Sequence, residues 1–288
     1  MTTSARERHS SAPARMSRDE RDELRSDALK MYPAGTFSGI ANVIMQLANA
    51  PVGRGVVEST VESGSAFKHP IKRARTTITY LAVAAAGTPE DRRAYREAVN
   101  TVHRQVRSTA ESPVKYHAMD PALQLWVAAC LYKGWEDTAR LYGRRGDVTE
   151  EAYRQGAVMG TTLQMPHEMW PATRAEFQEY WDETVADIEM DDEVRDYLTR
   201  LARVENLGPV VSTLFGWFSE TMTIGFLPPE FRDLMQMRQS TAQRAFFEAY
   251  NAAGRVASRI VPQPVQVFPF RLLLLDVRLR RRLGLPLV

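Results

Sequence analysis

Apolar residues recur along most of the chain at the three- and four-residue spacing of an α-helix. The stretch EAVNTVHRQV, residues 97–106, is an example: Val99, Val102 and Val106 share one face with the preceding Tyr95. The sequence lacks the strict alternation of half-buried strands bounded by Asn-Gly or Gly-Gly turns. The pattern therefore predicts an all-α fold.

Helix-start signals support this prediction. Thr88, Asp120 and Thr173 are good N-caps, and the first two are followed by prolines at the first helical position. The segment ALQLWVAACLY after Pro121 is apolar on all sides, which is typical of a central, buried helix. We find no repeat and no dividing linker, so residues 26–288 are predicted to form one multi-helix domain. The polar residues 1–25 are predicted to be a disordered arm.

Composition narrows the classes of function. The net charge of +2 gives no reason to expect a nucleic-acid partner. The N-terminus lacks the apolar core of a secretory signal, and no apolar run reaches the roughly eighteen residues that span a bilayer. A single cysteine, Cys130, cannot form an intramolecular disulfide, which fits a reducing compartment. We expect a cytoplasmic protein without a transmembrane segment.

The C-terminal stretch FRLLLLDVRLRRRLGLPLV interleaves leucines with Arg278, Arg280, Arg281 and Arg282. This pattern is compatible with an amphipathic helix that makes weak contact with a membrane surface. The alternative is a terminal helix packed on the body with its basic face in solvent, and this alternative is favoured because runs of charge are usually solvated.

Candidate chemistry begins with His103, which lies on the edge of the apolar stripe of its helix and should point inward. A buried neutral imidazole needs a partner for each nitrogen, so a core histidine and a metal ligand are both open interpretations. Arg73 and Thr77 are four residues apart on a helix beginning at Pro70, and Glu58 lies upstream. A Glu/Arg pair beside a histidine has the components of a site for oxygen chemistry.

These segments carry a resemblance. In order, IMQLANAPVGRGVVES, KRARTTITYLAVAAAGTPEDRR, AVNTVHRQVRS, YHAMDPALQLWVAACLY, WPATRAEFQEYWDE and GFLPPEFRDLMQMR resemble the mpaB-type oxygenase family, which includes the rubber-cleaving latex clearing proteins. The likeness extends from about Met31 to Arg238. It implies an all-helical fold with a buried pocket for a b-type haem held by one histidine.

Carried over by residue, the resemblance implies His103 as the proximal iron ligand, Arg73 and Thr77 as distal residues and Glu58 as a general base. His117 is a second-choice ligand. One departure is Thr76, because a rubber-cleaving relative has a lysine at that position. The resemblance also implies dioxygen and a lipophilic, alkene-containing small molecule as substrates. Two alternatives remain open, a haem-binding or haem-sensing protein without turnover and a haem-free helical protein that binds a lipophile. The oligomeric state stays open.

Overall fold

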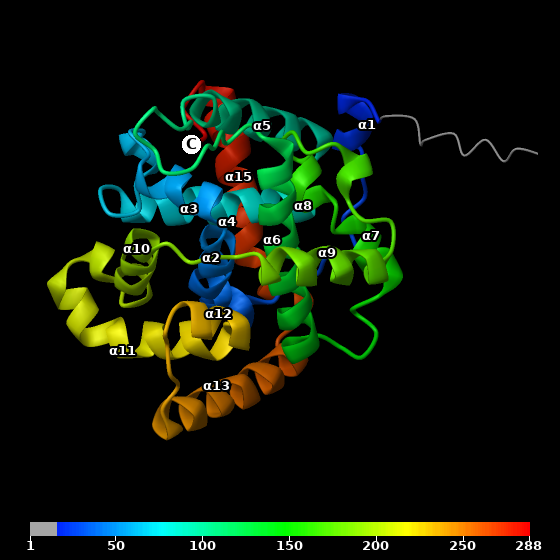
Figure 1. Ribbon diagram of the computed structural model, residues 1–288. Coiled ribbons are helices and arrows are strands. Elements are labelled where there is room, and N and C mark those ends of the chain that lie inside the picture. Colours follow the sequence, from blue (N-terminus) through cyan, green and yellow to red (C-terminus); the bar gives the residue numbers. More distant parts are fainter. Residues whose placement is uncertain (1–15) are drawn as a thin grey trace, which may run out of the picture.

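The computed structural model describes residues 16–288, and these residues form helices joined by loops (Figure 1). Apart from one isolated antiparallel bridge between Arg107 and His117, the described residues contain no strand pairing. The predicted all-α fold is therefore confirmed. The helices are α1 (Arg18–Asp22), α2 (Gly39–Ala48), α3 (Ala50–Val57), α4 (Pro70–Ala86), α5 (Pro89–His103), α6 (Pro121–Tyr142), α7 (Glu150–Gln155), α8 (Val158–Thr161), α9 (Arg174–Ala186), α10 (Asp192–Ala202), α11 (Pro209–Phe226), α12 (Pro229–Leu234), α13 (Thr241–Ile260), α14 (Gln263–Gln266) and α15 (Phe268–Leu283). Short 3-10 helices are Pro33–Ser38, Glu62–Gly64, His167–Met169 and Glu205–Leu207.

The core is built around α6, which crosses the middle of the molecule (Figure 1). Its apolar residues are buried on several sides, as the all-round apolar sequence predicts. Trp126 stacks on Trp181 of α9, and Tyr132 meets Tyr153 and Phe177 edge to face. Helix α2 packs against α3, α6, α10 and α11, and α8 packs against both α6 and α4, so α3 and α4 lie on the same body as α6.

The helix starts follow the sequence signals. Thr88 and Asp91 form a reciprocal capping box at the start of α5, with N···O distances of 3.3 and 3.2 Å. Asp120 accepts from the backbone N–H of Ala122 at the start of α6, and Thr173 caps α9 in the same way. These caps hold α5 and α6 at defined starting points, which fixes the helix that ends at His103.

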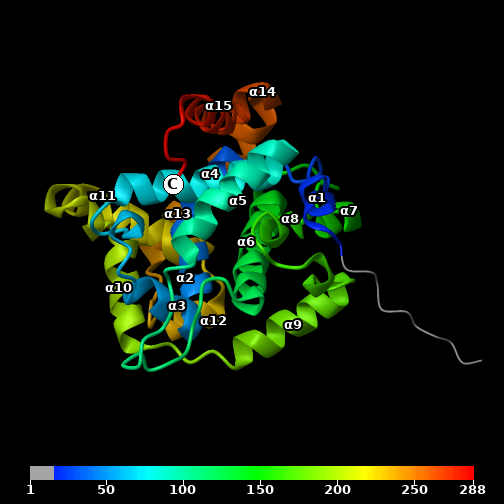
Figure 2. The same cartoon turned by 90° about the horizontal axis from the view of Figure 1, so that it is seen from above.

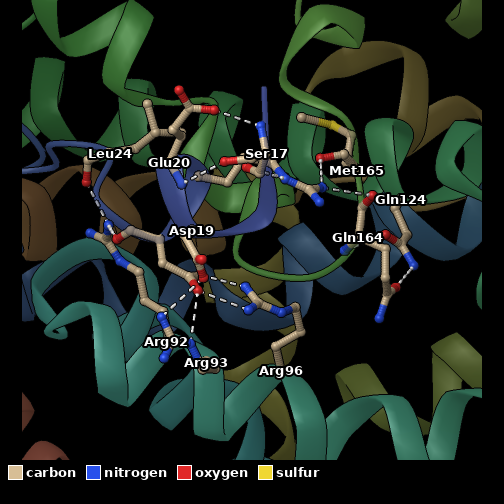
Figure 3. A network of polar contacts seen from close by, with 12 residues as sticks. Ser17, Asp19, Glu20, Leu24, Arg92, Arg93, Arg96, Gln124, Gln164 and Met165 are labelled. Atoms are coloured by element: carbon tan, nitrogen blue, oxygen red, sulfur yellow. Dashed lines mark hydrogen bonds and ion pairs between the residues drawn. The ribbon is translucent and has the colours of Figure 1, made fainter. Parts of the chain in front are cut away.

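The N-terminal boundary needs a correction. Residues 1–15 lie outside the described part of the chain, but residues 16–25, assigned above to a disordered arm, include α1 and pack on α5 (Figure 3). Asp22 forms a buried ion pair with Arg96, and Arg92 donates to the carbonyl oxygens of Asp22 and Leu24. The apolar pattern missed this because the anchor is ionic and joins residues about seventy positions apart.

The C-terminal helix α15 packs on α4 and α5 through the buried Leu274 and Val277. Arg278 and Arg281 turn inward and pair with Asp91 at 2.9 and 3.1 Å. The favoured alternative is correct that the helix packs on the body. Its solvated basic face is present in part, because Arg271 and Arg282 are exposed, but exposed leucines lie beside them on the outward side. Among residues 16–288, no helix combines the length and apolar character that crossing a bilayer requires.

Candidate functional site

A cavity of about 340 Å³ lies among α3, α4, α5, α6 and α8. Most of its wall is apolar, with valines and leucines from several helices. Arg73, Thr76, Tyr80, His103, Tyr116 and Val288 contribute to the lining. Lys72 and Gln124 are among the other polar residues of the wall.

His103 is the last residue of α5, and its imidazole lines this cavity. The predicted stripe is present: Tyr95 is fully buried, and Val99, Val102 and Val106 form wall beside the histidine. Because α5 is capped at its start and packed along this stripe, the imidazole is held by a rigid element.

The Nδ1 atom of His103 is buried and has no hydrogen-bond partner among the described residues. Burial lowers the pKa of His103 to about 4, and the positive charges of Arg73 and His117 act in the same direction. At neutral pH the imidazole is therefore uncharged, which is the form that ligates a metal. A core histidine would be expected to satisfy this nitrogen with a protein group.

Arg73 lies on α4, and its side chain faces the cavity. Arg73 as a residue is exposed, but the surrounding protein desolvates its guanidinium and lowers its pKa from the usual value, while Tyr197 and Tyr95 act to raise it. The guanidinium makes no hydrogen bond or ion pair within residues 16–288. Its five N–H donors are therefore available to an anionic or oxygen-bearing group in the cavity.

The threonines of α4 take different positions. Thr76 lines the cavity, whereas Thr77 is not part of the wall. Each hydroxyl bonds to the backbone carbonyl four residues earlier, Thr76 to Lys72 at 2.9 Å and Thr77 to Arg73 at 3.1 Å. Thr77 therefore makes no contact with the cavity that would support its predicted distal role, and this role stays a prediction.

Glu58 ends α3 and lies behind the cavity wall. Its Oε2 accepts from the hydroxyls of Ser112 at 2.5 Å and Tyr116 at 2.9 Å, and its Oε1 is 3.5 Å from Arg54. Tyr116 itself lines the cavity. Glu58 can therefore act on the cavity through the tyrosine hydroxyl, and its role as a general base also stays a prediction.

Other polar groups at the wall were not among the predicted site residues. Tyr80 donates to the carbonyl of Met159 in α8 at 2.5 Å, which ties α4 to the far wall. Gln124 contacts Gln164 (Figure 3), and Arg21 of α1 donates to the carbonyl of Gln164. Tyr80 could have been found, because it is seven residues after Arg73 and shares its helix face. The contact between Gln124 and Gln164 could not have been predicted from the sequence, because the two residues are forty positions apart.

The second-choice ligand, His117, is exposed and does not line the cavity. Within residues 16–288, no group of three or more His, Cys, Asp and Glu side chains is placed to hold a metal ion. Haem iron differs, since the porphyrin supplies four nitrogens and one axial side chain is enough. A neutral His103 with a buried nitrogen that has no partner, a partly open and largely apolar cavity, and cations at its wall fit a haem with two propionates.

Fold and site together define an all-helical protein with a buried, largely apolar cavity carrying one unpaired histidine and one unpaired arginine. Residues 30–259 match the family model described as "ER-bound oxygenase mpaB/B'/Rubber oxygenase, catalytic domain". The chain therefore belongs to this family of oxygenase catalytic domains.

Two relatives in mycobacteria are similar to the chain. The uncharacterized proteins Mb2261 of Mycobacterium bovis and Rv2237 of Mycobacterium tuberculosis are each 50% identical over 246 residues. The alignment covers 85% of this chain and 96% of each relative. No solved structure matches the chain.

Proposed function

We propose that this protein is a b-type haem-dependent oxygenase that acts with dioxygen on a lipophilic, alkene-containing small molecule. The observation that carries the proposal is His103, whose buried Nδ1 has no partner on the wall of the cavity. Because the chain belongs to an oxygenase family, we assign the imidazole of His103 to the iron of a haem. His103 would be the axial ligand, and the ammonium group of Lys72 would be available to a propionate.

When bound, haem supplies the iron centre at which dioxygen is activated. The chain supplies the surroundings. Arg73 offers N–H donors to an oxygen atom in the cavity, and the apolar wall excludes water and holds an apolar substrate. The Tyr116 hydroxyl, hydrogen-bonded to Glu58, offers a path by which a proton leaves or enters the cavity.

The apolar wall also supports a second candidate, a haem-free protein that binds a lipophile. A haem-binding protein without turnover is the third candidate.

The cellular location that we propose remains the cytoplasm, on the ground that the chain has a single cysteine.

The test is the absorption spectrum of the purified protein after haem reconstitution, with a pyridine haemochrome assay. We expect a b-type Soret band in the wild type that is lost or shifted in His103→Ala and retained in His117→Ala. The latter is the matched control, because His117 is exposed outside the cavity. A wild type without a band would reject the haem and favour the lipophile-binding candidate.

A second measurement separates an oxygenase from a haem carrier. The reduced protein is mixed with dioxygen and an apolar alkene, and oxygen consumption is followed with an electrode. We expect consumption that depends on the alkene and falls in Arg73→Ala. Reversible oxygen binding without consumption would favour the carrier.

A further inference from the structure

The outward face of α15 is apolar along its whole length. Phe268, Leu272, Leu275, Leu279 and Leu283 follow a four-three-four-four spacing, which places them on one side of the helix. Each of these side chains is 49 to 61% exposed. Single exposed leucines are ordinary, but five on one helix face form a continuous apolar surface that needs an explanation. We call these five residues the α15 patch.

The patch continues at its N-terminal end. Val265 of α14, which packs on α15, is 60% exposed, and Ile260 at the end of α13 is 72% exposed. Figure 2 shows α14 and α15 along the outer edge of the molecule, with α4 and α5 on their inner side. No described segment covers this edge of α15.

Arginines predominate among the charges around the patch, although Glu90 and Asp91 of α5 lie near Arg282. From Arg255 to Val288 the chain has seven arginines and a single acidic residue, Asp276. Arg271 is four residues before Leu275, and Arg282 is three residues after Leu279, so both border the same edge of the patch. Neither side chain forms a hydrogen bond or ion pair with residues 16–288, in contrast to the arginines that pair with Asp91 and Asp276.

We propose that the α15 patch docks on the surface of an anionic lipid bilayer. The leucines would enter the boundary between headgroups and acyl chains, and Arg271 and Arg282 would meet lipid phosphates. An amphipathic helix with arginines beside an apolar face has the composition that such docking requires. Arg278 and Arg281 hold α15 to α5 through Asp91, and Arg75 of α4 pairs with Asp276 of α15. The helix can therefore dock without leaving the fold.

A second copy of the chain is a less suitable occupant. An antiparallel pair of α15 helices brings like edges together, so Arg271 and Arg282 would face their own counterparts. In a parallel pair, Arg271 and Arg282 of one copy would face the other edge of α15 in the second copy. The acidic residue at that edge, Asp276, already pairs with Arg75 and Arg280. In both arrangements the two arginines stay without a compensating charge, whereas anionic headgroups supply one.

The patch is also close to the cavity along the chain. After Leu283 the backbone turns at Gly284, with φ of 66°, and Leu285 to Val288 run back along α4. Arg75 of α4 donates to the carbonyl oxygen of Leu287 at 3.3 Å, and Val288 forms part of the cavity wall. Docking would bring this part of the cavity wall near the lipid, so an apolar substrate would have a short path from the bilayer to the cavity. That last consequence rests on the proposed function, but docking requires neither haem nor turnover.

The experiment is flotation of the full-length protein with vesicles of phosphatidylcholine alone or of phosphatidylcholine with phosphatidylglycerol. We expect the wild type to float with the anionic vesicles and to be released by high salt. Leu275→Ser with Leu279→Ser, and separately Arg271→Glu with Arg282→Glu, should each weaken the partition by about tenfold or more.

Leu214→Ser is the matched control, since Leu214 is 69% exposed on α11, outside the patch. Circular dichroism checks that each variant is folded, and light scattering reports the oligomeric state without lipid. Absence of flotation with anionic vesicles would overturn the proposal. So would patch variants that float as well as the wild type, an equal loss in Leu214→Ser, or a wild-type dimer that Leu275→Ser converts to a monomer.

Discussion

Arg73 and His103 line the same cavity, and burial together with the positive charge of Arg73 lowers the pKa of the imidazole to about 4. One residue comes from α4 and the other from the end of α5. At neutral pH a charged donor therefore shares the cavity with an uncharged imidazole. The proposed function uses both groups, with the imidazole assigned to the iron and the guanidinium to an oxygen atom.

The two threonines of α4 can be separated experimentally. Thr76 lines the cavity and Thr77 does not, and the Thr76 oxygen, whose hydrogen is donated to Lys72, can still accept a hydrogen bond from a group in the cavity. Thr76→Val should therefore lower oxygenase turnover by about tenfold, the loss of that one hydrogen bond worth about 1.4 kcal/mol. Thr77→Val should stay close to the wild type. Turnover and the Soret position of the reconstituted proteins are the measurements. A larger loss in Thr77→Val would restore the residue that the family resemblance implies.

Glu58 and Tyr116 should act as a unit. Tyr116→Phe removes the hydroxyl that joins the cavity to the carboxylate, and Glu58→Gln removes the negative charge that accepts from it. We expect each variant to lower turnover, with the double variant no worse than the more impaired single variant. Glu58→Gln should also lower the free energy of unfolding by about 1–3 kcal/mol, because Arg54 and Ser112 lose a charged acceptor. Additive losses would show that the residues act independently.

The anchor of α1 gives a stability prediction. Asp22→Ala leaves the buried Arg96 without its partner, and this should reduce the free energy of unfolding by about 3–5 kcal/mol. Asp19→Ala is the control, because its pair with Arg93 is exposed and should contribute less than about 1 kcal/mol. Urea denaturation compares the two variants. Equal losses would mean that the ion pair of Asp22 is not what holds α1.

Asp91 predicts a dependence of stability on pH. Burial alone would raise the pKa of Asp91, but hydrogen bonds from Arg278 and Thr88 outweigh it, so the pKa lies below its usual value. The stabilisation is therefore fully present above the ordinary carboxyl pKa of about 4 and is lost as the pH falls through the lowered value. Asp91→Asn should be less stable than the wild type by about 1–3 kcal/mol at pH 7. The difference should shrink below about pH 4, and a difference that is constant with pH would contradict this account.

The sequence predicts what depends on local pattern. Helix starts at Thr88 and Asp120 and the inward stripe that carries His103 follow from capping chemistry and 3.6-residue periodicity, and the structure has them. The choice between Thr76 and Thr77 could not be made this way, because one residue turns a side chain by about 100° and the exact face depends on packing. Contacts between distant segments, such as Asp22 with Arg96, have no local signal at all.

The carboxylate of Asp91 belongs to two structures at once, the cap of α5 and the anchor of α15. His103 ends the same helix, and its fifteen residues span about 22 Å. One end of α5 lies beside α15, where Asp91 pairs with Arg278, and the other end lies at the cavity, where His103 forms part of the wall. The surface helix α15 and the cavity residue His103 are therefore joined through a single helix and one carboxylate.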